Sequence, residues 1–134
     1  SRIFIFSFLV LCATSSLLAA SGDRSRLHRE LSKAEEAEDK AAIIELSRRI
    51  VAIAPNEAST WETLVETQIE AQEFDDAAKS LDAWQKAVKR PPAVIEDFRG
   101  DIFLQRKDYP NAERHWLAFL AKKPSAAATS PRSA

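Results

Sequence analysis

Acidic residues recur at helical spacing in two parts of the chain. Glu62, Glu66 and Glu70 lie four residues apart, and Asp97 and Asp101 repeat that spacing. Residues four apart lie above one another on a helix, so each set predicts one acidic helix face. Such a face is typical of a solvated surface that keeps a domain soluble. Alternatively, it binds a basic or amine-bearing segment of a partner protein. The sequence leaves both interpretations open.

The residue types that catalysis requires are sparse. The two histidines, His28 and His115, lack the local spacing of metal ligands, and we expect them at the surface or at its boundary with the core. Two glycines cannot form a glycine-rich phosphate loop, and no serine lies in a nucleophile elbow. Trp61, Trp84 and Trp116 could stack on sugars or bases, but their spacing indicates the core. We therefore expect a non-catalytic protein with no metal and no cofactor.

The composition gives no reason to expect a nucleic-acid ligand. The 134 residues include 19 basic and 20 acidic side chains, for a formal net charge of −1. Nucleic-acid binding usually requires a basic patch or stripe. Cys12 is the only cysteine, so the chain after residue 20 has no thiol or disulfide chemistry. The two glycines and many alanines favour helix over sheet.

The first twenty residues have the pattern of an export signal. A basic residue at position 2 is followed by an apolar run and then by small residues up to position 20. We expect residues 1–20 to be a signal peptide and the protein to be extracytoplasmic, either periplasmic or secreted. The alternative is an uncleaved membrane anchor, residues 3–20, because about 18 apolar residues approach the length that crosses a bilayer. At the other end, residues 125–134 predict a disordered tail or linker.

Apolar periodicity predicts six helices after the signal segment. In each, apolar residues recur three or four positions apart and form one buried stripe; Ile53 belongs to the stripe of the second helix. Asp39 and Asp108 suit the N-cap of the second and sixth helices, and Pro91–Pro92 stop the fourth. The connections are short, so neighbouring helices should pack antiparallel as three hairpins. The expected helices cover residues 24–37, 40–54, 57–71, 74–88, 93–105 and 109–122.

A degenerate repeat relates these hairpins to one another. Ala77 and Ala112 are 35 residues apart, and an aromatic residue lies three positions before each. A large apolar residue, Leu81 or Trp116, lies four positions after each alanine. A third copy lies upstream, in residues 39–56. A period of this length that is built from helix pairs indicates a solenoid.

These residues resemble the tetratricopeptide repeat family, whose signature is Trp-x-x-Leu-Gly-x-x-Tyr, then Ala-x-x-x-Phe, then Pro. The middle copy has Trp61 and Leu64, then Ala77 and Leu81, at the matching positions, and the last copy keeps the glycine as Gly100. The resemblance implies an all-α fold, a right-handed solenoid of three antiparallel helical hairpins over residues 24–124. A generic antiparallel helical bundle that happens to repeat is the alternative.

The resemblance also implies where a partner binds, because the first helix of each pair lines an inner groove in this family. In the first copy, His28, Ser32 and Glu35 occupy the groove positions. The groove is acidic, so we expect a protein or peptide partner, and a basic one in particular. The implied partner-binding residues of the other copies are Glu62, Glu66, Ile69, Glu70, Asp97, Asp101 and Leu104.

The sequence is consistent with two functions for this protein. The first is a non-catalytic protein–protein interaction scaffold, exported from the cytoplasm, that binds a partner segment on its concave face. The alternative is an N-terminal structural fragment of a longer repeat protein that carries another domain downstream. Trp116, Phe119 and Leu120 are the buried candidates of the last helix, yet nothing after Pro124 could cover its apolar side. We therefore expect that the natural protein continues past Ala134 or that this end self-associates.

Overall fold

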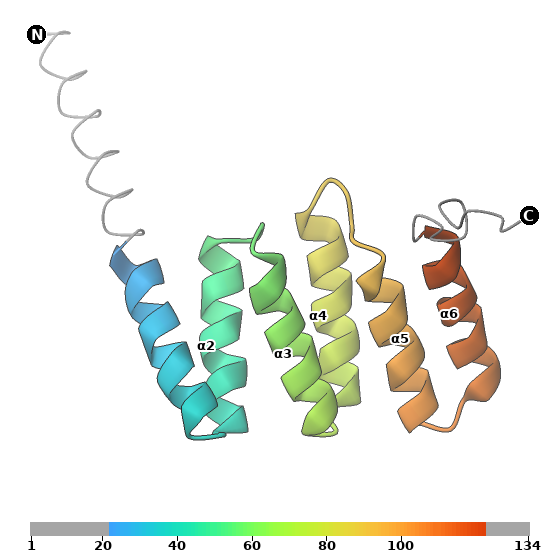
Figure 1. Ribbon diagram of the computed structural model, residues 1–134, viewed down its shortest axis with the longest axis horizontal. Helices are drawn as coiled ribbons and strands as arrows, with labels where there is room; N and C mark the ends of the chain where they lie inside the picture. Colours follow the sequence, from blue (N-terminus) through green and yellow to red (C-terminus); the bar gives the residue numbers. More distant parts are fainter. Residues whose placement is uncertain (1–21, 123–134) are drawn as a thin grey trace, which may run out of the picture. The chain divides into compact units, whose positions relative to one another are not determined.

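The structure is a computed structural model that describes residues 22–122. Within that range it contains helices and turns and no strand, so the predicted all-α class is confirmed. Residues 22–36 are helical. The signal segment and the tail, residues 1–20 and 125–134, lie outside the described residues. The labelled helices are α2 (Lys40–Ile53), α3 (Ala58–Glu70), α4 (Phe74–Ala87), α5 (Val94–Gln105) and α6 (Tyr109–Lys122), as Figure 1 shows.

The helices begin and end within a few residues of the expected positions, because the sequence marks their ends. Asp39 caps α2, and its Oδ1 accepts a hydrogen bond from the backbone N–H three residues on, at 3.2 Å. Asp108 takes the same role at α6, where the corresponding distance is 3.4 Å. Both caps pair a backbone N–H that a helix leaves unpaired. Pro91 and Pro92 separate α4 from α5, since proline cannot continue a helical hydrogen-bond ladder.

Three turns in the chain share one backbone conformation. Glu38, Gln72 and Lys107 have φ values of 53°, 61° and 61°, and they lie 34 and 35 residues apart. In each turn, the N–H of this residue bonds to the carbonyl three residues back, and the next N–H bonds to the carbonyl five back. This pair of bonds is the Schellman motif that ends helices. The structure therefore repeats one turn at the period of the sequence.

The first compact unit ends at Leu64, inside α3. Trp61 is buried in this unit, and its Nε1–H donates a hydrogen bond to the Pro55 carbonyl at 2.9 Å. Ile53 is 45% exposed, so its expected place on the buried stripe is wrong. As the last residue of α2, it has no further turn of that helix beside it. The core cluster of the unit consists of Leu27, Leu31, Ala34, Ile43 and Ile50.

The second compact unit starts at Val65. In it α4, α5 and α6 lie side by side and successive helices run antiparallel (Figure 1), as the short connections predict. Trp84 is almost completely buried, which confirms that this indole belongs to the core. The core of the unit consists of Val65, Ala77, Leu81, Trp84, Ile95, Phe98, Ile102 and Ala112.

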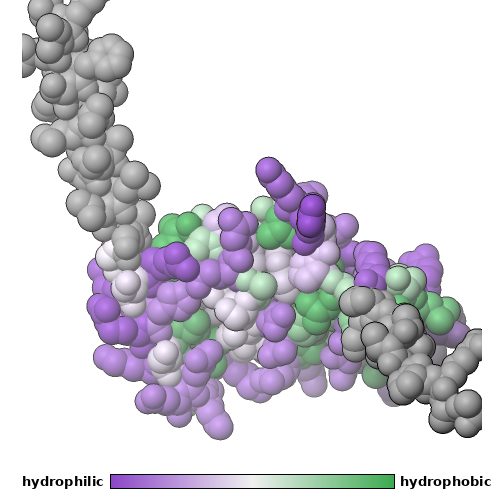
Figure 2. All heavy atoms as spheres, turned by 45° about the horizontal axis from the view of Figure 1, so that its top comes forward, coloured by the Kyte–Doolittle hydropathy of each residue, from purple (hydrophilic) through white to green (hydrophobic). Residues whose placement is uncertain are grey.

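Helix α6 approaches α5 closely at one point and leaves part of its apolar side exposed. A Cβ atom at Gly100 would lie 2.6 Å from Cδ1 and 3.0 Å from Cε2 of Trp116, so the indole occupies the space that a side chain would need. Trp116 itself is half-buried. Leu120 is 63% exposed, so its expected burial is wrong. No further described helix covers this side of α6. Figure 2 shows a visible face that is largely hydrophilic, with smaller apolar patches.

Candidate functional site

Helix α5 presents two faces of different chemistry. Successive residues of an α-helix are rotated by about 100° around its axis. Asp97, Asp101 and Leu104 therefore lie on one face, which we call the acidic face. Arg99 lies on the opposite face, and so does Arg106 at the C-cap. The acidic face contains predicted partner-binding residues, whereas no residue of the opposite face was predicted to bind a partner.

The two carboxylates of the acidic face have no cation beside them. Asp97 and Asp101 are both half-buried, and Leu104 next to them is exposed. Burial raises the pKa of Asp101 above its usual value of 3.8, and the negative charge of Asp97 raises it further. Among residues 22–122, no cationic side chain forms an ion pair or hydrogen bond with either carboxylate. The acidic face is therefore a charged surface whose charge is not compensated.

The remaining predicted site residues lie on α3. Glu62, Glu66, Ile69 and Glu70 share one face of this helix by the same rotation. Glu66 and Glu70 are exposed, whereas Glu62 and Ile69 are half-buried. Glu62 belongs to the first compact unit, and the other three belong to the second. The structure thus brings the predicted residues of α5 together on one helix face and, separately, those of α3.

Glu96 is a buried carboxylate of α5 whose negative charge is compensated by hydrogen-bond donors and cations. It is 8% exposed and accepts hydrogen bonds from His115 Nδ1 at 2.7 Å, Lys122 Nζ at 3.2 Å and Arg99 Nη1 at 3.3 Å. Burial alone would raise the pKa of Glu96. The hydrogen bonds from His115 and Lys122, and the charges of Lys122 and Arg99, outweigh burial and lower it below 4.5. Asp101, on the same helix, has no such partners.

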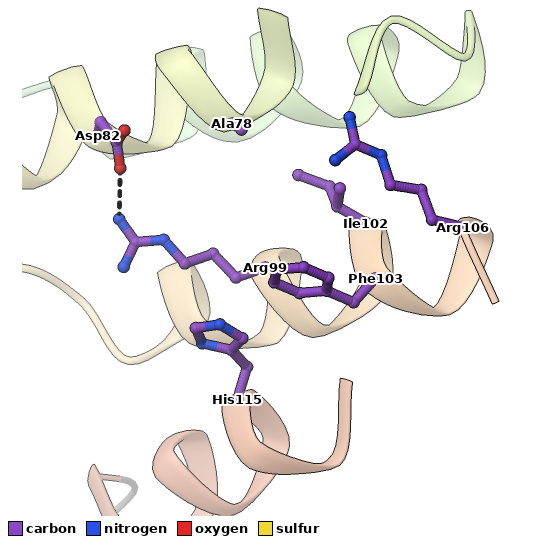
Figure 3. A pocket seen from close by; sticks show the side chains of 7 residues that line it. All are labelled: Ala78, Asp82, Arg99, Ile102, Phe103, Arg106 and His115. Carbon is purple, nitrogen blue, oxygen red and sulfur yellow. Dashed lines mark hydrogen bonds and ion pairs between the residues drawn. The ribbon is translucent and has the colours of Figure 1, made fainter. Parts of the chain in front are cut away.

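A pocket of about 220 Å³ lies between α4, α5 and α6, and we call it the arginine pocket. Figure 3 shows Arg99 near one end, Arg106 near the other, and the Phe103 ring between them. The ring of Phe103 stacks on that of His115, with 5.3 Å between the centroids and 5° between the planes. The pocket is lined mainly by apolar surface, from Ala78, Asp82, Arg99, Ile102, Phe103, Arg106 and His115.

The two arginines of this pocket are held in different ways. Arg99 Nη2 donates to Asp82 Oδ1 at 2.9 Å and to Gln85 Oε1 at 2.7 Å, so its guanidinium is fixed between α4 and α5. Arg106 pairs with Asp75 and lies over the Phe74 ring, 5.8 Å from its centroid. The Arg106 and Asp75 side chains are 41% and 88% exposed. Arg99 is therefore a fixed part of the wall, whereas Arg106 is accessible to solvent.

A second pocket, of about 230 Å³, lies within the first unit. It brings together His28, Ser32 and Glu35, the groove positions that the resemblance implies for the first copy. His28 Nε2 pairs with Glu57 Oε1 at 2.9 Å, and its side chain is 39% exposed. Both histidines thus lie at the boundary between surface and core, as expected. The full lining is His28, Leu31, Ser32, Glu35, Ser59, Thr60 and Thr63.

The sequence contained a signal for the arginine pocket, although we did not use it. Arg99, Phe103 and Arg106 are four and three residues apart, which places them on one face of a helix. Their partners Asp82 and Asp75 are on α4, many residues away in sequence. Which acid pairs with which arginine depends on how α4 packs on α5, and apolar periodicity does not determine that.

No protein-family model matches this chain, and searches of the curated proteins and of the solved structures find no match either. None of the helices in the described range is long and apolar enough to cross a membrane. Within residues 22–122, no group of three or more His, Cys, Asp or Glu side chains could hold a metal ion. Fold and helix geometry together define an all-helical, repeat-like protein whose α5 carries side chains of opposite charge on opposite faces.

Proposed function

We propose that this protein is a non-catalytic interaction scaffold that binds a basic segment of a partner protein on the acidic face of α5. One observation carries the proposal: Asp97 and Asp101 are half-buried, adjacent and without a cation. Partial burial of a carboxylate costs free energy unless a cation or hydrogen-bond donor compensates it. A lysine or arginine of the partner would supply that compensation.

The geometry of the acidic face describes the segment that fits it. Asp97 and Asp101 are one helical turn apart, so their Cβ atoms are separated by about 5–6 Å. Leu104 is exposed one turn further on and offers an apolar contact. A segment with two basic residues at this separation and an apolar residue beside them matches all three groups.

The proposal includes the repeat family and the export of the protein. We propose that the hairpins are degenerate tetratricopeptide repeats, stacked as a right-handed solenoid. In support, the Schellman turns at residues 38, 72 and 107 are 34 and 35 residues apart. Gly100, at the family's close-packing position, lies directly under the Trp116 indole.

Export rests on the signal-like pattern of residues 1–20. N-terminal sequencing of the protein from its native cells tests cleavage of this segment: a start near residue 21 supports a signal peptide, and an intact N-terminus contradicts cleavage and favours the membrane anchor.

Peptide binding at two salt concentrations tests the acidic face. One fluorescent peptide carries two lysines beside a leucine, and a comparison peptide carries two glutamates in place of the lysines. The protein is titrated into each peptide at about 20 and 150 mM salt. We expect the protein to bind the basic peptide, more weakly at high salt. Asp101→Asn should weaken this binding about two- to fivefold, because it removes one partly exposed ion pair.

The matched control is Glu113→Gln, which removes the same charge from an exposed position on α6. This variant should bind the basic peptide as the unmodified protein does. Equal affinity for the two peptides would rule out the acidic face as a site for basic segments. An equal loss in Asp101→Asn and Glu113→Gln would rule it out as well, because it would indicate attraction to the overall charge.

A further inference from the structure

We propose that the arginine pocket is a second binding site, and that it takes an aromatic side chain of a partner segment in which acidic residues flank the aromatic one. This site lies on the side of α5 opposite the acidic face and prefers a partner of the opposite charge (Figure 3). The proposal therefore goes beyond the proposed function, and neither site depends on the other.

The size and walls of the pocket fit one side chain. Its volume of about 220 Å³ is below the range of about 300–1,000 Å³ that is usual for sites of drug-sized ligands. Ala78 and Ile102 supply aliphatic walls and Phe103 supplies an aromatic one. An aromatic side chain can stack against Phe103 while it buries apolar surface. Buried aromatic anchors of this kind carry much of the affinity at protein interfaces.

The aromatic wall is held in place before any partner arrives. Phe103 stacks in parallel on His115, and His115 is oriented by the hydrogen bond between its Nδ1 and Glu96 Oε2. Glu96 also accepts hydrogen bonds from Arg99 and from Lys122. Because these side chains are already ordered, a ligand would lose little free energy to ordering them. The network around Glu96 thus supports a preformed pocket.

Charge complementarity selects the acidic flanks. Arg106 lies at one end of the pocket, and its pair with Asp75 is exposed on both sides. Ion pairs this exposed contribute little to stability, so Arg106 can exchange Asp75 for a carboxylate of the partner. Arg99 lies at the other end, where its guanidinium stays hydrogen-bonded to Asp82, Gln85 and Glu96. Arg106 can therefore bind one acidic residue beside the aromatic one directly, and the fixed positive charge of Arg99 lies near the acidic residue on the other side.

Calorimetric titration of the protein with a defined peptide tests the site. The probe is an N-acetylated, C-amidated peptide with one phenylalanine between two aspartates. Two comparison peptides carry alanine in place of phenylalanine, or asparagines in place of the aspartates. We expect saturable binding of the probe with a dissociation constant below about 1 mM. Replacing phenylalanine by alanine should weaken binding about tenfold or more, because the apolar contact is lost.

Two variants of the pocket and one control assign the binding to this place. Ala78→Leu fills the pocket with aliphatic carbon and leaves every charge unchanged, so it should abolish binding. Arg106→Gln alters an exposed side chain and should weaken binding about two- to fivefold. Arg114→Gln removes the same charge from an exposed position on α6 that does not line the pocket, and it should have no effect. Circular dichroism checks that each variant is folded. If Ala78→Leu does not fold, the effect of Arg106→Gln on peptide binding decides whether the peptide binds in the arginine pocket.

Several results would overturn the proposal. They are the absence of saturable binding, equal binding of the peptide with asparagines, and unchanged binding by a folded Ala78→Leu or by Arg106→Gln. Equal losses in Arg106→Gln and Arg114→Gln would indicate attraction to net charge alone. A last arm uses 3-phenylpropionate, a small aromatic acid. If it binds as tightly as the peptide, the pocket is a small-molecule site and the peptide assignment is wrong.

Discussion

Replacing Gly100 by alanine should destabilise the protein, although helix propensity alone predicts the reverse. In the interior of a helix, glycine to alanine is worth about 1 kcal/mol in favour of alanine. Here the new Cβ would lie 2.6 Å from Cδ1 and 3.0 Å from Cε2 of Trp116, so the indole must move. Overpacking of this kind costs about 1–3 kcal/mol. The two effects leave an expected net loss of about 1 kcal/mol in the free energy of unfolding.

Urea unfolding followed by circular dichroism measures this loss, and a second background isolates its cause. In Trp116→Leu the indole is absent, so Gly100→Ala should there become stabilising by up to about 1 kcal/mol. The double-mutant cycle then gives the interaction between the two positions. Gly22, where an added Cβ would have no packing contact within 4 Å, provides the control. Gly22→Ala should be neutral or stabilising.

Two results would refute this reasoning. In the first, Gly100→Ala stabilises the protein as much as Gly22→Ala does, which would mean that Trp116 does not occupy the space above Gly100. In the second, Gly100→Ala destabilises equally with and without the indole, which would mean that the loss comes from another contact. Either result would contradict the close contact between Gly100 of α5 and Trp116 of α6.

Three further substitutions have expected effects on unfolding. Glu96→Gln should lower the free energy of unfolding by about 1–3 kcal/mol near neutral pH, because the hydrogen bonds to this side chain lose a charged acceptor. The folded pKa of Glu96 is lowered, so its contribution to stability is present above pH 4.5 and disappears as the pH falls through the folded pKa. The unmodified protein and the variant should therefore become equally stable in acid. Asp101→Asn should instead stabilise by about 0.2–0.5 kcal/mol near neutral pH. Because the folded pKa of Asp101 is raised, this gain should vanish at low pH, where the carboxyl is protonated, and a gain that persists there would contradict the assignment. Lys107→Gly should raise the melting temperature, since φ at Lys107 is 61° and glycine adopts that conformation at a cost lower by about 1 kcal/mol; a lower melting temperature would count against the turn.

Asp101 illustrates why a binding site can reduce the stability of the free protein. Its charge is partly buried beside Asp97 and has no cation among the described residues, so it opposes folding near neutral pH. Asp101→Asn should therefore make the protein more stable and the basic peptide more weakly bound. A structural surface charge would not be expected to show that combination.

The helices were predictable from the sequence because their determinants are local. Asp39 and Asp108 cap the helices that follow them, and the 34- and 35-residue spacing of the Schellman turns matches the spacing of Ala77 and Ala112. The left-handed conformation of the turn residues could not be predicted. Glutamate, glutamine and lysine occupy positions where glycine usually indicates the left-handed end of a helix, so the sequence gives no indication of these turns.

The candidate sites were predictable only in part. That Asp97 and Asp101 share a helix face follows from the helical period alone. The burial that raises the pKa of Asp101 depends on neighbouring helices and could not be predicted. For the same reason the sequence did not reveal the pairing of Arg99 with Asp82. Relations within one helix follow from spacing, whereas relations between helices follow from packing.

Amide chemical shifts provide the most direct test of binding at the acidic face. The ¹⁵N-labelled protein is titrated with the peptide that carries two lysines beside a leucine. We predict that the largest shift changes occur between Asp97 and Leu104 on α5, and that Asp101→Asn diminishes them. Changes spread evenly over the described residues, or concentrated instead around the arginine pocket, would contradict binding of a basic segment at this face.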